Sequence, residues 1–138
     1  MISQEKLKPL NVLINKEMNK KPEELNELFF TEVLGWKKYF PAHITFGNSD
    51  WWWLDKEGKY VAEPDELPKL QLSLDLQEEY LIPVLIDKEF DVFSFTHEYS
   101  HWQCAMQEYS RFGSISATAK TKPLAQLTAG LKALGVIE

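Results

Sequence analysis

The chain contains one cysteine and one arginine in 138 residues, and both scarcities limit what it can do. Because Cys104 stands alone, the chain can form neither an internal disulfide nor a zinc site of four thiolates, and we expect a reducing, cytoplasmic environment. All cations other than Arg111 are lysines. Bidentate recognition of a phosphate or carboxylate would therefore fall to Arg111, although a surface ion pair is the more common role for such a residue.

Long apolar runs are also missing. No run approaches the roughly 20 residues that a membrane-spanning helix needs, and the first residues lack a basic region followed by an apolar one. We therefore expect a soluble protein with no membrane partner. The net charge of −6 makes a nucleic-acid partner unlikely, because phosphate contacts require clustered lysine and arginine. The length fits one domain over residues 22–138, after an amino-terminal extension, 1–21, of uncertain structure.

The most specific motif is His97-Glu98-Tyr99-Ser100-His101, which spells H-E-x-x-H. On a helix, the two imidazoles share one face and can bind one zinc ion, while the glutamate activates the metal-bound water. On a strand or in a turn, this geometry is lost. The periodicity of residues 91–112 fits both a helix with an aromatic face and two strands joined by a hairpin at the motif.

A catalytic zinc ion of this type needs a third protein ligand. Downstream of the motif the candidates are Glu108, which lies only seven residues on, and the terminal Glu138. His43 lies upstream, in an unusual order for such a site. The motif has no clear third ligand, so we predict no metal, no cofactor and no catalytic residue, with zinc hydrolysis as the alternative.

Other segments give clearer signals for secondary structure. A proline and glutamates at the start of a segment, with a glycine after its end, predict a first helix. Aromatic residues on both sides of a glycine turn predict a hairpin. Ser73 or Asp75 can begin a second helix, which Pro83 should end or kink. The predicted elements are a helix over 22–34, a hairpin over 50–61, a loop over 62–72, a strand over 114–119 and a helix over 122–134, with Thr121 as its cap.

Three consecutive tryptophans lie in the predicted hairpin. Successive side chains of a strand point to opposite faces, so if Trp51 and Trp53 pack inward, Trp52 points to the other face. All three rings can belong to the core, or one can bind a ligand or partner. If a nucleotide is bound, we expect the ligand-binding residues to be Trp52, Tyr109 and Arg111.

Several short motifs resemble the phage ABA sandwich domain, a family of small phage and prophage proteins. They are the helix 25–36, Leu74-Asp75-Leu76, Trp102-Gln103-Cys104, Ala117-Thr118-Ala119 and the Thr-Lys-Pro-Leu-Ala-Gln-Leu run at 121–127. The resemblance implies an α+β fold, mainly an antiparallel sheet packed between helices in an α-β-α sandwich. It also implies that the H-E-x-x-H residues lie at a strand junction, and it carries no established activity.

Together these observations predict a small non-enzymatic phage-encoded binding protein in the bacterial host cytoplasm. It would inhibit a host protein or sequester a nucleotide-like small molecule, as an anti-defence protein would. This hypothesis is favoured because the sequence has many aromatic residues but no complete set of catalytic residues. The alternatives are a zinc metalloprotease with Glu98 as general base and an oligomeric structural or assembly protein.

Overall fold

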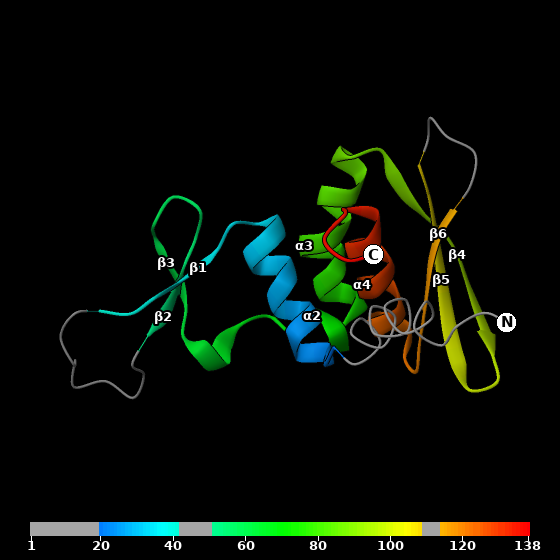
Figure 1. The fold of residues 1–138 in the computed structure, drawn as a ribbon, viewed down its shortest axis with the longest axis horizontal. Coiled ribbons are helices and arrows are strands. Elements are labelled where there is room, and N and C mark those ends of the chain that lie inside the picture. Colours follow the sequence, from blue (N-terminus) through cyan, green and yellow to red (C-terminus); the bar gives the residue numbers. More distant parts are fainter. Residues whose placement is uncertain (1–19, 42–50, 109–113) are drawn as a thin grey trace, which may run out of the picture.

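The fold places helices between two antiparallel sheets of three strands each (Figure 1). The structure is a computed structural model, and it describes residues 20–41, 51–108 and 114–138. The helices are α2 (Pro22–Leu28), α3 (Leu74–Asp87) and α4 (Lys122–Ala133). The first sheet contains β1 (Lys37–Tyr39), β2 (Trp52–Leu54) and β3 (Tyr60–Ala62), and the second contains β4 (Phe90–Glu98), β5 (His101–Glu108) and β6 (Ser114–Ala119).

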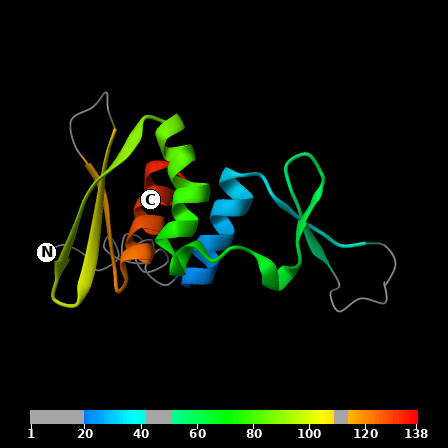
Figure 2. The ribbon, with the colours of Figure 1, turned by 180° about the vertical axis from the view of Figure 1, so that it is seen from behind.

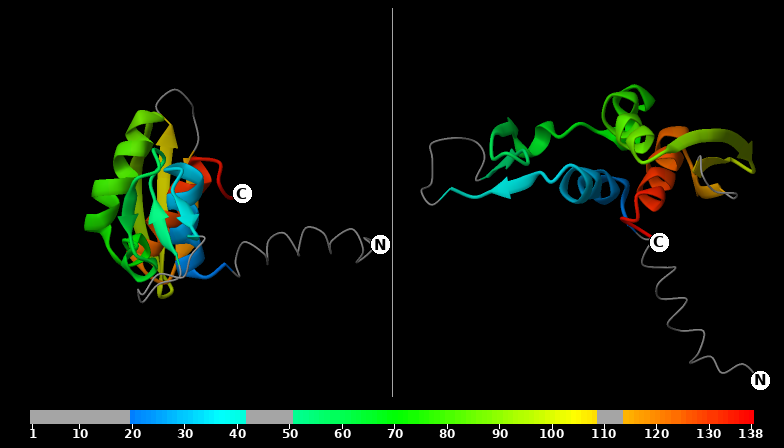
Figure 3. Two further views of the ribbon diagram at one scale, coloured as in Figure 1. Left: turned by 90° about the vertical axis from the view of Figure 1, so that its left-hand side faces the viewer. Right: turned by 90° about the horizontal axis from the view of Figure 1, so that it is seen from above.

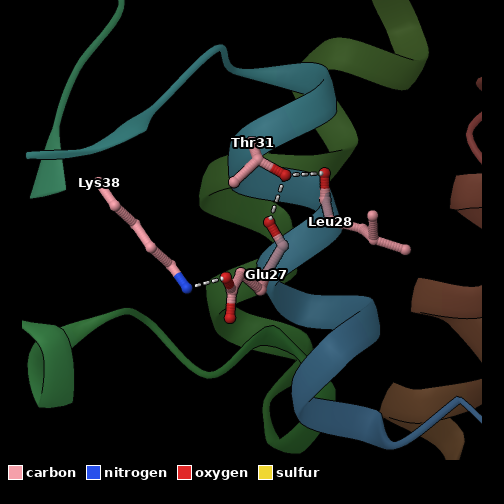
Figure 4. Close-up of polar contacts among 4 residues, drawn as sticks. All are labelled: Glu27, Leu28, Thr31 and Lys38. Atoms are coloured by element: carbon pink, nitrogen blue, oxygen red, sulfur yellow. Dashed lines mark hydrogen bonds and ion pairs between the residues drawn. The ribbon is translucent and has the colours of Figure 1, made fainter.

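The first helix begins as its sequence predicts, with Pro22 in the first turn. It continues from α2 into a wider π-helical turn, Phe29–Val33, and Gly35 follows with a φ of 76°. The Thr31 hydroxyl donates to the backbone carbonyls of Glu27 at 3.1 Å and Leu28 at 3.4 Å (Figure 4). The predicted helix over 22–34 is confirmed, with this turn as a detail that the pattern did not reveal.

The second helix, α3, begins at the predicted cap, because the Ser73 hydroxyl accepts a hydrogen bond from the Leu76 amide at 3.1 Å. Of the two outcomes expected at Pro83, an end or a kink, the end does not occur, because α3 runs on to Asp87. The proline ring lies on the exposed side of the helix, while Leu81 and Leu85 are fully buried on the other side. Burial of these leucines outweighs the backbone hydrogen bond that proline removes.

The described residues of the stretch 91–112, whose periodicity fitted both a helix and two strands joined by a hairpin, form two strands and a turn. β4 and β5 pair as an antiparallel hairpin, and Tyr99 and Ser100 form its turn with φ values of 51° and 67°. The next strand, β6, has the predicted bounds and pairs with β5. Helix α4 follows, and its Thr121 cap accepts from the Leu124 amide at 3.4 Å. The predicted strand over 114–119 and helix over 122–134 are confirmed.

The main core lies between the helices and the inner face of the second sheet. Cys104 and Met106 of β5 are fully buried there. The α+β class, with antiparallel sheets packed against helices, is confirmed. The two sheets lie on opposite sides of the helices, and the outer face of β4–β6 carries exposed polar residues.

The first sheet extends beyond α2, on the side away from β4–β6 (Figures 2 and 3). Its buried residues, Trp53 and Ala62, are separate from the main core cluster. Asn26 of α2 anchors the chain that returns from this sheet, donating to the Pro68 carbonyl at 2.7 Å and accepting from the Leu70 amide at 3.0 Å. The predicted hairpin of β2 and β3 is confirmed.

The returning segment over 62–72 was predicted to be a loop, and it includes two short 3-10 turns, Pro64–Glu66 and Leu70–Leu72. No helix in the described ranges has the length and apolar character needed to cross a bilayer.

Candidate functional site

The H-E-x-x-H residues occupy the tip of the β4–β5 hairpin. Glu98 pairs with His101 across the strands, and His97 pairs with Trp102, on which its ring packs at a centroid distance of 4.7 Å. Because neighbouring positions of a strand face opposite sides, the His97 imidazole lies on the sheet face opposite to that of His101. The helical geometry that would bring both imidazoles to one zinc ion is therefore absent.

The outer face of this hairpin holds a shallow polar cavity of about 310 Å³. The Thr96 hydroxyl donates to the Gln103 side-chain carbonyl at 3.2 Å, and His101 Nδ1 lies 3.0 Å from the Tyr99 carbonyl oxygen. Glu98 also lines this cavity. One imidazole and one carboxylate do not complete a metal site, and within the described residues no group of three or more His, Cys, Asp or Glu is placed to hold a metal ion.

A second candidate site is the cluster of aromatic side chains on the first sheet, which we call the aromatic surface. Tyr39, Phe40 and Tyr60 are 45%, 64% and 55% exposed, and Trp51 and Trp52 are half-buried. The rings contact one another in pairs, with centroid distances of 5.3 Å for Tyr39 and Trp52 and 6.0 Å for Phe40 and Trp51. Strand register places Tyr39, Trp52 and Tyr60 on one face and Phe40 and Trp51 on the other, so the aromatic surface comprises both faces of this small sheet. Aromatic residues are enriched at protein interfaces.

The three tryptophans divide between the two faces of β2 as the strand alternation predicts. Trp51 and Trp53 pack edge to face at 5.3 Å, and Trp52 lies against Tyr39 on the other face. Trp53 is only 1% exposed, and its indole N–H has no hydrogen-bond partner among the described residues. Trp53 is therefore the packing centre of this sheet, and its two neighbours remain accessible.

Lys38 joins the aromatic surface to the helices. Its ammonium forms a 2.7 Å ion pair with Glu27 of α2 (Figure 4) and lies 5.0 Å from the ring centroid of Trp51 and 5.6 Å from that of Trp53. A lysine over an aromatic face is attracted by the ring quadrupole, whose face carries partial negative charge. This single side chain therefore helps to fix the orientation of β1 relative to α2.

Carboxylates surround one side of the aromatic surface. Glu63, Asp65 and Glu66 follow β3, and loss of solvent around the Tyr60 hydroxyl, together with these charges, raises the pKa of Tyr60 above its usual value. Glu63 and Glu66 also close the turn after β3, each accepting from the backbone amide of the other. The rim on the β3 side of the aromatic surface is therefore acidic.

Of the three predicted ligand-binding residues, Trp52 alone lies in the described part of the chain. Trp52 belongs to the aromatic surface, whereas Tyr109 and Arg111, like His43, lie outside the described residues. A nucleotide site formed by all three remains a prediction.

Among the residues of the aromatic surface, the sequence analysis named Trp52 as a candidate but not Tyr39, Phe40 or Tyr60. The available signal was the aromatic pair directly after two lysines in Lys37-Lys38-Tyr39-Phe40. It is a weak signal, because β1 has only three residues and gains its meaning from pairing with β2, which is distant in the sequence.

Comparison of the chain with protein-family models, with curated proteins and with solved structures gives no match.

Proposed function

We propose that this protein is a small binding protein, encoded by a phage or prophage, that uses the aromatic surface to engage a bacterial host protein in the cytoplasm. The observation that carries the proposal is the exposure of Tyr39, Phe40 and Tyr60 beside two half-buried tryptophans. Tyrosine and tryptophan dominate the binding energy of protein interfaces because they bury large areas with few rotatable bonds.

The position of the surface supports this function. The first sheet projects beyond α2, and its described residues do not belong to the main core. Packing of the main core therefore does not explain why these aromatic residues are there. The acidic rim on the β3 side favours a partner with an apolar centre and basic residues at one edge. The phage origin rests on the family resemblance of the sequence alone.

The alternative zinc hydrolase receives no support from the hairpin, because His97 and His101 face opposite sides of the sheet. An oligomeric assembly protein would use the same aromatic surface against a second copy. Light scattering of the purified protein separates these cases, since a monomer at high concentration leaves the surface available for another protein.

The test compares two matched double variants in capture from a bacterial lysate, read by quantitative mass spectrometry. Phe40→Ser with Tyr60→Ser removes exposed rings from the aromatic surface. Leu72→Ser with Ile86→Ser removes equally exposed apolar side chains elsewhere, at 69% and 55% exposure. We expect the first variant to lose a protein that the wild type and the second variant retain.

Both variants should keep the stability of the wild type within about 0.5 kcal/mol, because the four side chains are at the surface. If the two variants retain the same set of proteins as the wild type, the aromatic surface is not the binding site and the proposal is wrong.

A further inference from the structure

The free edge of the second sheet forms one wall of a groove. β6 is the edge strand of the order β4-β5-β6, and within the described part of the chain its backbone pairs with β5 alone. Three consecutive strand residues, Ala117 to Ala119, and Lys120 directly after the strand line a cavity of about 660 Å³. Because neighbouring side chains of a strand face opposite ways, three in a row reach one cavity only where the strand edge itself borders it.

The opposite wall of the groove is apolar. Leu124 and Thr128 of α4 lie one helical turn apart along it, and Leu25 of α2 and Ile137 also line the groove. Small side chains on β6, Ala117 and Ala119, leave room for another backbone to approach. This combination of an open strand edge and a flanking apolar wall is what strand addition requires.

The charge of the groove is opposite to that of the whole protein. Lys20, Lys120 and Lys132 line it, and no aspartate or glutamate does so among the described residues, in a chain whose net charge is −6. Lys132 also donates from its ammonium to the backbone carbonyl of Ser116 at 3.4 Å, so one lysine already reaches the β6 backbone. An occupant with carboxylates near its ends complements these positions.

We propose that the β6 edge and this groove bind an extended, acidic peptide segment of a partner protein, which adds to the second sheet as a fourth strand. Main-chain hydrogen bonds to β6 supply affinity, and the lysines select acidic over basic segments. This site is separate from the aromatic surface, which lies on the other side of the helices (Figure 1).

The probe is a synthetic peptide with a fluorophore, in which valine and threonine alternate over six positions, the length of β6, between pairs of glutamates. Fluorescence anisotropy measures its binding to the full chain. We expect the same peptide with lysines in place of the glutamates to bind at least about tenfold more weakly. Equal binding of the two peptides, or no binding of the acidic one at millimolar concentration, would overturn the proposal.

N-methylated peptides test the backbone part of the proposal without changing the protein. Only alternate residues of an added strand bond to β6, so methylation at the valines and methylation at the threonines should differ in effect. We expect one of these two peptides to lose binding and the other to keep it. If both bind as the unmethylated peptide does, no strand is added.

Charge reversal locates the site on the protein. Lys20→Glu with Lys120→Glu should weaken binding of the acidic peptide by about tenfold, whereas the matched control Lys56→Glu with Lys59→Glu should leave it unchanged. The control lysines are exposed and lie beside the β2–β3 turn. Phe40→Ser with Tyr60→Ser should also leave peptide binding unchanged, so failure here and failure of the aromatic surface are distinguishable. Equal loss in both lysine variants would refute the assignment.

Discussion

The substitution Gln77→Met tests how a buried polar network holds α3 to its neighbours. Gln77 is fully buried, and its amide donates to the carbonyls of Leu70 and Pro123, each at 2.7 Å. Its carbonyl accepts from the Gln126 amide at 2.7 Å. Methionine has a similar length and volume but satisfies none of these three partners.

The expected loss of stability follows from the hydrogen-bond partners that Gln77→Met leaves unpaired. The Leu70 carbonyl and the Gln126 amide belong to residues that are 0% and 5% exposed, whereas Pro123 is half-buried and nearer to water. Each buried unpaired group costs about 1–2 kcal/mol, so Gln77→Met should lower the free energy of unfolding by about 2–4 kcal/mol. That is a large part of the roughly 5–15 kcal/mol expected of a domain this size.

Urea denaturation followed by circular dichroism measures the effect as a lower midpoint with an unchanged m value. Gln103→Met is the matched control, because this glutamine is exposed on β5, and it should change stability by less than about 0.5 kcal/mol. The double variant Gln77→Met with Gln126→Met should cost less than the sum of the single changes, since it removes both ends of one bond. A loss below about 1 kcal/mol for Gln77→Met, or strictly additive losses, would refute the reasoning.

Three other predictions concern the core, a thiol and the hairpin turn. Gly130→Ala places a methyl group 3.0 and 3.1 Å from the two terminal carbons of buried Leu81, so unfolding free energy should fall by about 1 kcal/mol despite the better helix propensity of alanine. Burial raises the pKa of the Cys104 thiol from 9.0 to about 12. As the pH rises, the thiol ionises in the unfolded chain before it ionises in the folded one. The contribution of the buried thiol to the free energy of unfolding is therefore fully present below pH 9 and is lost toward pH 12, by about 1 kcal/mol per pH unit. Cys104→Ala should make this decline of stability with pH less steep. Tyr99→Asn with Ser100→Gly supplies residues suited to positive φ and should stabilise the hairpin by about 1 kcal/mol.

Denaturant unfolding checks each of these predictions. A gain in stability from Gly130→Ala would mean that Leu81 moves aside at little cost. Identical pH profiles for the wild type and Cys104→Ala would contradict the raised thiol pKa. Failure of the turn substitution to stabilise would contradict the turn conformation at the H-E-x-x-H residues.

Helices and strands were predicted correctly where several local signals in the sequence agreed. Thr121, Pro123 and the leucine stripe mark one end and one face of α4, and the alternation over 114–119 matches β6. Pro83 did not end α3, which was one of its two expected effects, because burial of Leu81 and Leu85 opposes a local backbone preference and outweighs it. Tertiary packing of that kind is not visible in a short sequence window.

The H-E-x-x-H segment was ambiguous for a different reason. Its turn residues, Tyr99 and Ser100, adopt positive φ without the asparagine or glycine that usually announces such a turn. The aromatic surface was only partly predictable, because it forms when β1 pairs with β2 and β2 with β3. The groove beside β6 joins α2, β6 and α4, so no local pattern contains it.

The central claim is that the aromatic surface, and not the H-E-x-x-H hairpin, is where the protein engages its partner. Hydrogen–deuterium exchange of the free protein and of the complex purified from lysate tests it most directly. We predict slower exchange in β1, β2 and β3 on binding, with residues 97–101 unchanged. Slower exchange confined to residues 97–101, with β1, β2 and β3 exchanging as in the free protein, would contradict the claim.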